Sequence, residues 1–277
     1  MSIDNSHKIN LNSKLLIYIP TYNCADYILG VIDEIPEKFW DLADILIIDN
    51  CSTDETTKLI QDAQFSKRWS NRVHLVQTDS NLGYSGSQKL AYRIALDSTK
   101  MQHVIMLHGD GQYSPELLNE FLPYIGSEYG VVYGFRDKSY YPGKEETPFF
   151  TYWIIKLLSS IESLVTGYKR KEWHTGFVMY SRGFLERVNL GALTDTYHID
   201  GHIQFVAGDL KERVQAVPIW KRYKKYQQLG GIKRLMYIFH VLSLIVRFKV
   251  LGSGQTDVES NALKHEYFYF PNPNDEI

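Results

Sequence analysis

The chain has 277 residues, 44% hydrophobic and 22% charged, with a formal net charge of −2. This length and composition predict one large globular domain, or one domain with an appendage, and the near-neutral charge argues against a nucleic-acid binder. Two cysteines, Cys24 and Cys51, allow at most one disulfide, which favours a reducing, cytoplasmic setting. Residues 1–13 are polar and carry no apolar signal core, so we expect no export signal there.

Up to residue 135, short apolar runs alternate with stretches of helical spacing. The apolar runs predict buried strands at 15–19 (ended by Pro20), 44–49, 73–76, 104–107 and 131–133. The spacing between them predicts helices at 25–35, 54–67 and 115–122, and one that follows a glycine-bearing turn at 81–86 and runs to about residue 98. This alternation predicts an α/β fold with a doubly wound, mostly parallel sheet and helices on both faces.

The pattern changes after residue 135. A polar segment, 136–147, predicts a mobile loop. The following elements are expected to be helices at 149–165, 181–188 and 199–207 and strands at 174–180 and 214–219. The helix at 149–165 is apolar but interrupted by polar residues, which favours a core or interface helix over a membrane span.

A basic segment without Asp or Glu extends from Lys221 to Lys249. Its centre, 235–246, is apolar and too short to cross a bilayer, which needs about 20 residues. It predicts an amphipathic helix that lies in an anionic membrane interface or contacts a partner, although a solvated basic face remains the alternative. We therefore divide the chain into a main domain at 1–225 and a C-terminal helix and polar tail at 226–277.

Three polar loops follow predicted strands, at 20–23, 49–54 and 108–112. The carboxyl ends of parallel strands meet at one edge of a sheet, where ligands bind in open α/β folds. Asp110, between Gly109 and Gly111, could hold a divalent metal against a diphosphate there, or could simply be a turn residue. The Cys and His spacings do not predict a zinc site.

The motifs resemble those of nucleotide-sugar glycosyltransferases with the GT-A fold, of the family 2 type. The nearer likeness is to the branch that makes dolichyl- and polyprenyl-phosphate sugars. The matching segments are Ile-Pro-Thr-Tyr-Asn at 19–23, Ile-Asp-Asn-Cys-Ser-Thr-Asp at 48–54, Asn-Leu-Gly at 81–83, Asp-Gly-Gln at 110–112 and Glu-Trp-His-Thr-Gly-Phe at 172–177.

The resemblance implies roles for these residues. Asp110 would bind Mn²⁺ or Mg²⁺, Asp49 would accept hydrogen bonds from the base or ribose, and Gln112 would contact phosphate or acceptor. The other residues implied to bind nucleotide are Pro20, Thr21, Tyr22, Asn23, Asn81 and Gly83. Arg222 and Lys224 would close over the diphosphate.

The sequence also departs from the family pattern. His108 stands where the family usually has an aspartate, so it either ligates the metal and favours Mn²⁺ or hydrogen-bonds the sugar. Glu172 and His202 replace the usual Asp and Glu, which leaves Asp200 and Glu172 as candidate general bases.

The resulting prediction is a metal-dependent, inverting hexosyltransferase of cell-envelope polysaccharide synthesis. It would move a sugar from a UDP- or GDP-sugar to a polyprenyl phosphate or lipid-linked glycan. We expect it in the cytoplasm, peripheral at the inner membrane face; its oligomeric state is left open. The alternative is a non-catalytic GT-A-like module that binds a sugar nucleotide or a partner.

Overall fold

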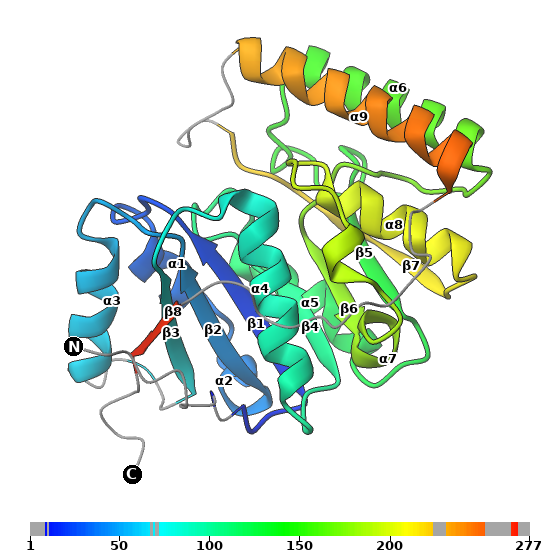
Figure 1. Ribbon diagram of the computed structural model, residues 1–277. Helices are drawn as coiled ribbons and strands as arrows, with labels where there is room; N and C mark the ends of the chain where they lie inside the picture. Colours follow the sequence, from blue (N-terminus) through cyan, green and yellow to red (C-terminus); the bar gives the residue numbers. More distant parts are fainter. Residues whose placement is uncertain are drawn as a thin grey trace. The chain divides into compact units, whose positions relative to one another are not determined.

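The computed structural model describes residues 9, 11–66, 69, 72–223, 231–252 and 267–270. The chain divides into two compact units, Met1–Asn119 with Ala262–Ile277, and Glu120–Asn261. Their elements are shown in Figure 1. The predicted boundary at residue 225 remains a prediction.

The first unit contains a sheet in the order β4-β1-β2-β3-β8. Its strands are β1 (Leu15–Thr21), β2 (Ala43–Asp49), β3 (Val73–Thr78), β4 (His103–Met106) and β8 (Tyr267–Phe270). Strands β4, β1, β2 and β3 are parallel, and every residue of β2 is buried. Burial on both faces explains why these strands appear in the sequence as unbroken apolar runs.

One expectation for this sheet is wrong, and one of its strands was not predicted. Pro20 was expected to end the first strand, but β1 continues to Thr21 in register with Asp49 of β2. The aromatic residues of the predicted tail form β8, which pairs antiparallel with β3; the Tyr269 hydroxyl lies 3.2 Å from His74 Nδ1. Distant pairing of this kind leaves no local signal in the sequence.

Helices pack around this sheet. They are α1 (Ile28–Asp33), α2 (Lys38–Leu42), α3 (Thr56–Phe65) and α4 (Gly83–Asp97). The short helix α2 was not predicted, and α1 and α3 are shorter than expected. One helix was predicted at 115–122, but the structure has three short helical segments there. They are the 3₁₀ helix η1 (Pro115–Leu117), the α-helix α5 (Leu118–Phe121) and the 3₁₀ helix η2 (Leu122–Tyr124).

In the second unit, β5 (Val131–Arg136) pairs parallel with β7 (Val214–Ile219) and antiparallel with β6 (Val178–Ser181). Its helices are α6 (Phe149–Thr166), α7 (Arg182–Leu185), η3 (Leu190–Ala192), α8 (Ile199–Asp209) and α9 (Gly231–Leu251). Arg136 was assigned to a polar loop, but it is the last residue of β5 and is buried. In the remainder of that loop, Glu146 accepts a hydrogen bond from the Tyr223 N–H at 2.7 Å, and the mobility of the loop stays a prediction.

Helices α6 and α9 lie side by side (Figure 1). Val241, Leu244 and Ile245 of α9 are buried against Leu158 of α6 and Phe205 of α8. The predicted C-terminal helix therefore packs into a hydrophobic core along one side. In the described parts of the chain, the helices lack the combined length and apolarity that crossing a bilayer requires.

Candidate functional site

The carboxyl ends of β1 and β2 are joined by hydrogen bonds that extend the strand ladder. The Asn50 N–H donates to the Thr21 carbonyl at 2.9 Å, and the Thr21 hydroxyl donates to the Ile48 carbonyl at 3.2 Å. Thr21 is buried, whereas Tyr22 and Asn23 are exposed. The sheet therefore holds Thr21 inside and presents Tyr22 and Asn23 to solvent at its edge.

Asp49, the last residue of β2, has a fully buried carboxylate whose two oxygens are held by the chain itself. Oδ1 accepts hydrogen bonds from the hydroxyl and the N–H of Ser52. Oδ2 accepts from the Thr57 hydroxyl and from the Gln77 amide, the latter at 3.0 Å. Four donors to one carboxylate fix the loop after β2. The expected contact of Asp49 with a base or ribose stays a prediction.

Asn50 links that loop to the start of α4. Its amide nitrogen donates to Asn81 Oδ1 at 3.0 Å and to the Gly83 carbonyl at 3.2 Å. The Leu82 N–H donates back to Asn50 Oδ1 at 2.8 Å. Gly83 has a φ of 70°, a left-handed conformation that glycine adopts without steric cost. The Asn-Leu-Gly segment therefore lies beside the loop after β2.

The loop after β4 runs close against the end of β1. The Gly109 N–H donates to the Pro20 carbonyl at 3.3 Å, and a Cβ on Gly109 would lie 2.7 Å from Thr21 Cγ2. Only glycine allows this approach. Asp110 is half-buried, and its Oδ1 accepts the Gln112 N–H at 2.9 Å. The carboxylate can therefore be reached by a ligand at the sheet edge.

The carboxylates of this edge act on one shared neighbour, Cys24. The pKa of its thiol is raised to about 11, first by burial and then by the negative charges of Asp110, Asp54 and Asp49. Asp49 lies in register with Thr21 of β1, and Gly109, next to Asp110, donates its N–H to the Pro20 carbonyl, so the loops after β2 and β4 lie at the same edge of the sheet. An excess of negative charge there favours a bound cation.

Backbone strain also gathers at this edge. Asn23 and Cys51 have φ values of 51° and 60°, in the left-handed region that non-glycine residues seldom adopt. The Asn23 N–H donates to the Ser52 hydroxyl, and Asn23 Oδ1 accepts the Thr53 N–H, both at 2.9 Å. Strained conformations held by hydrogen bonds cluster at functional sites.

His108 lies beside two tyrosines. Its ring centroid is 5.0 Å from that of Tyr113 and 6.0 Å from that of Tyr84. The ring is half-buried, one residue from Gly109 and two from Asp110. Packing between aromatic rings orients the imidazole; its role as a metal ligand remains a prediction.

In the second unit, Glu172 forms a buried ion pair with Arg136, a residue that the sequence analysis did not select. Arg136 Nε lies 2.8 Å from Oε1, and the Arg136 N–H donates to Oε2 at 2.8 Å. Burial alone would raise the pKa of Glu172, but the guanidinium and these hydrogen bonds outweigh burial and lower it. A fully buried, paired carboxylate with a lowered pKa is a poor general base.

The other candidates in this unit lie on α8 and after β7. Asp200 is buried in the first turn of α8, and His202 Nδ1 accepts the Thr194 N–H at 3.0 Å. The Arg222 guanidinium lies 5.3 Å from the Trp220 ring centroid. Lys224 lies outside the described residues.

Comparison with known proteins identifies the family. Residues 16–188 match glycosyl transferase family 2. The matched region is more than half of the chain, and the chain belongs to this family. It is therefore a glycosyltransferase.

Three curated proteins are similar to parts of this chain. The chain is 24% identical over 193 residues to the uncharacterized protein MJ0544 of Methanocaldococcus jannaschii, covering 68% of this chain and 80% of the relative. It is 31% identical over 127 residues to glycosyltransferase AglJ of Haloferax volcanii, covering 46% of this chain and 37% of the relative. A putative teichuronic acid biosynthesis glycosyltransferase, TuaG of Bacillus subtilis, is 27% identical over 109 residues, covering 39% of this chain and 40% of the relative.

Solved structures share the fold. Glucosyl-3-phosphoglycerate synthase from Mycobacterium tuberculosis, in complex with Mn²⁺, UDP and glucosyl-3-phosphoglycerate, gives a TM-score of 0.60 at 14% identity, covering 94% of this chain and 88% of that one. Mannosyltransferase PcManGT from Pyrobaculum calidifontis, in complex with GDP-Man and Mn²⁺, gives 0.59 at 16% identity, covering 94% and 73%. The α/β fold of the GT-A class expected from the sequence is confirmed.

Proposed function

We propose that this glycosyltransferase moves a hexose from a UDP- or GDP-sugar to a polyprenyl phosphate or lipid-linked glycan, with inversion at the anomeric carbon. The carrying observation is the common edge in the first unit, where the loops that bear Asp49 and Asp110 both adjoin the end of β1 and Asp110 is half-buried. The M. tuberculosis and P. calidifontis neighbours were solved with Mn²⁺ and with UDP or GDP-Man, which supports a nucleotide sugar and a divalent ion as ligands.

The residues present fit such an ion. A carboxylate oxygen from Asp110 suits Mg²⁺ and Mn²⁺ alike, and an imidazole nitrogen from His108 would favour Mn²⁺. When bound, the ion would neutralise charge on the leaving nucleoside diphosphate. Gln112, two residues further on, would contact phosphate or acceptor, while Arg222 and Lys224 would add positive charge toward the diphosphate.

The nucleoside would lie along the first two loops. Tyr22 and Asn23 are exposed at the end of β1, and Asn81 is exposed where α4 begins. Pro20, Thr21 and Gly83 would shape the same pocket through their backbone. Asp49, whose carboxylate fixes the loop after β2, would accept hydrogen bonds from the base or ribose.

Sugar transfer requires an acceptor oxygen to attack the anomeric carbon while the bond to the diphosphate oxygen breaks. The nucleoside diphosphate departs with the bonding electrons, and one such displacement inverts the configuration. A phosphate acceptor is already ionised and needs little help from a base. A hydroxyl acceptor would transfer its proton to a carboxylate, for which we favour Asp200 over the ion-paired Glu172.

A lipid-linked acceptor is supported by the exposed face of α6 and α9. In the described part of the chain, most exposed large apolar side chains lie on these two helices: Phe149, Phe150, Trp153, Ile154, Leu157 and Leu164 on α6, and Leu235, Met236, Phe239, Leu242, Val246, Val250 and Leu251 on α9. Arg247 and Lys249 are exposed on α9. An apolar face with basic neighbours suits the surface of an anionic membrane, and we propose a peripheral position at its cytoplasmic side.

Activity is tested by incubating the chain with UDP- and GDP-sugars, Mn²⁺ or Mg²⁺, and membrane lipid extract, and measuring released nucleoside diphosphate. We expect release that depends on the metal and on the lipid. Asp110→Asn should lower the rate by about 100-fold or more, the scale seen when one electrostatic group is removed. Asp62→Asn, at an exposed position on α3, is the matched control.

Absence of turnover with every donor would favour the non-catalytic module. Turnover by Asp110→Asn at the parent rate would refute the metal assignment. The anomeric configuration of the product, read by NMR, decides between inversion and retention.

A further inference from the structure

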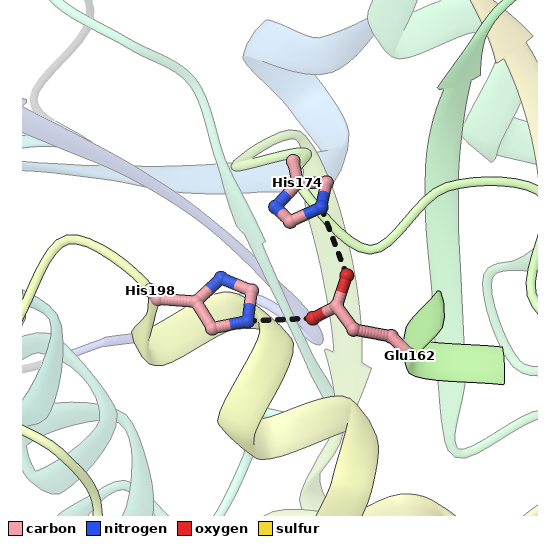
Figure 2. Close-up of side chains that lie close together, drawn as sticks. All are labelled: Glu162, His174 and His198. Atoms are coloured by element: carbon pink, nitrogen blue, oxygen red, sulfur yellow. Dashed lines mark hydrogen bonds and ion pairs between the residues drawn. The ribbon is translucent and has the colours of Figure 1, made fainter. Parts of the chain in front are cut away.

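A carboxylate and two imidazoles converge inside the second unit. Glu162 on α6, His174 before β6 and His198 at the start of α8 each offer a ligand atom, and these atoms lie within 4.8 Å of one another. Figure 2 shows both rings directed at the Glu162 carboxylate, one at each oxygen. The Glu162 side chain is fully buried, and the two histidine side chains are 2% and 1% exposed.

The two contacts to the carboxylate differ. His198 Nε2 forms a hydrogen bond of 2.7 Å with Oε1. His174 Nε2 lies 2.8 Å from Oε2, but the angles do not fit a hydrogen bond, and among the described residues neither atom has another hydrogen-bond partner. A buried nitrogen and a buried oxygen without hydrogen bonds cost free energy unless a ligand binds them.

The far sides of both rings meet one hydroxyl. Tyr237 Oη on α9 lies 2.7 Å from His174 Nδ1 and 3.3 Å from His198 Nδ1. Histidines that ligate a metal commonly donate their second ring N–H to an outer partner, which fixes the tautomer and turns the other nitrogen toward the ion. Tyr237 can accept from both Nδ1–H groups and so leave both Nε2 atoms as ligands.

We propose that Glu162, His174 and His198 form a zinc site, separate in chemistry from the Asp110 site. Two imidazole nitrogens and one carboxylate oxygen are a donor set that Zn²⁺ accepts, with a fourth position left for water. The hard ions proposed at Asp110 prefer oxygen ligands. The ion would join α6, the segment before β6 and α8, with Tyr237 of α9 as the outer partner; its burial favours a structural role.

The test uses the full chain carrying Asp110→Asn, so that the Asp110 site does not contribute metal. After chelation, dialysis against Zn²⁺ and removal of free ion, mass spectrometry should find about one zinc per chain, as folding-coupled sites retain their ion. Glu162→Gln and His198→Gln should lose the zinc, and His240→Gln on α9 should keep it. Tyr237→Phe should weaken zinc affinity by about 10–100-fold, an effect that packing alone would not produce.

The proposal is overturned if the chain with Asp110→Asn alone and the chain that also carries Glu162→Gln retain equal amounts of zinc, or if neither retains any. Should Glu162→Gln fail to fold, Co²⁺ titration of the Asp110→Asn chain decides the question. Intense visible absorption from tetrahedral Co²⁺, displaced by Zn²⁺, supports the site, and absence of that absorption refutes it. These readouts do not depend on glycosyl transfer.

Discussion

Arg136 and Glu172 are joined by a buried ion pair that connects the end of β5 to the segment before β6. Arg136 Nε donates to Glu172 Oε1 at 2.8 Å, and a further nitrogen of the guanidinium donates to the His174 carbonyl at 3.1 Å. The Arg136 side chain is 3% exposed and that of Glu172 is fully buried. One arginine therefore fixes the position of both Glu172 and the backbone at His174.

The first prediction concerns the removal of this carboxylate. Glu172→Gln leaves the Arg136 charge buried without its partner, and we expect a loss of about 3–5 kcal/mol in the free energy of unfolding. Urea denaturation measures it. Glu186→Gln is the matched control, because Glu186 is exposed and its pair with the half-buried Arg182 is worth under about 1 kcal/mol. Intact stability with abolished turnover would instead assign Glu172 to proton transfer.

The second prediction concerns the loop that carries Asp110. Gly109→Ala places a Cβ 2.7 Å from Thr21 Cγ2 and 2.9 Å from the Pro20 carbonyl, closer than real Cβ atoms come. We expect the loop to shift and catalysis to fall about 100-fold, the scale of a 1 Å misplacement. Steady-state kinetics with saturating Mn²⁺ measure this.

Gly30→Ala is the control for that substitution. Gly30 lies within α1, and a Cβ there meets nothing within 4 Å. Replacing glycine by alanine at a compatible position stabilises a protein by about 0.4–1 kcal/mol, so the control should be active and slightly more stable. Equal activity of Gly109→Ala and Gly30→Ala would contradict a tight approach of the Asp110 loop to β1.

The sequence predicted the four parallel strands of the first unit well, because a strand buried on both faces needs a continuous apolar run. The loops that follow them could be located for the same reason. Local pattern could not show that Asp49 is bound by Ser52, Thr57 and Gln77, since Gln77 lies on another strand.

Long-range pairs were missed for a related reason. Arg136 is 36 positions from Glu172, and Glu162 is also 36 positions from His198. Metal motifs are recognised by short spacings, whereas this cluster takes its ligands from separate elements. Glu162 is the acidic residue within the apolar sequence of α6, so a search for acidic residues inside predicted apolar helices would have selected it.

The third prediction concerns pH. Asp44 accepts the Ser13 N–H at 2.7 Å and the Asn12 N–H at 2.5 Å, and its Oδ1 lies 3.7 Å from His74 Nε2. Burial alone would raise the pKa of Asp44, but the contact with His74 and these N–H groups outweigh burial and lower it below its ordinary value of 3.8. The stabilisation is therefore fully present above that value and is lost as the pH falls through the lower folded pKa.

Asp44→Asn should cost about 1–3 kcal/mol in the free energy of unfolding at pH 7, the range for a buried hydrogen-bonded group. The difference from the parent chain should shrink as the pH falls below 3.8. Denaturation curves between pH 2 and 7 test this, with the exposed Asp26→Asn as control. A difference that stays constant across this range would show that ionisation of Asp44 does not stabilise the fold.

The fourth prediction concerns the face formed by α6 and α9. Trp153 on α6 is 57% exposed and Phe239 on α9 is 70% exposed, whereas Val241, also on α9, is buried in the core. Deleting α9 would expose that core, so point substitutions are the cleaner test. Trp153→Glu with Phe239→Glu should abolish flotation of the chain with anionic liposomes, because each substitution removes an apolar contact and adds repulsion from the lipid charge.

Phe65→Glu, at a 70% exposed site on α3, is the matched control and should float like the parent chain. Raised salt should weaken parental binding, since Arg247 and Lys249 contribute through screened charge. If the double variant floats as well as Phe65→Glu, the lipid surface contacts another part of the chain, and the case for a lipid-linked acceptor loses its main structural support.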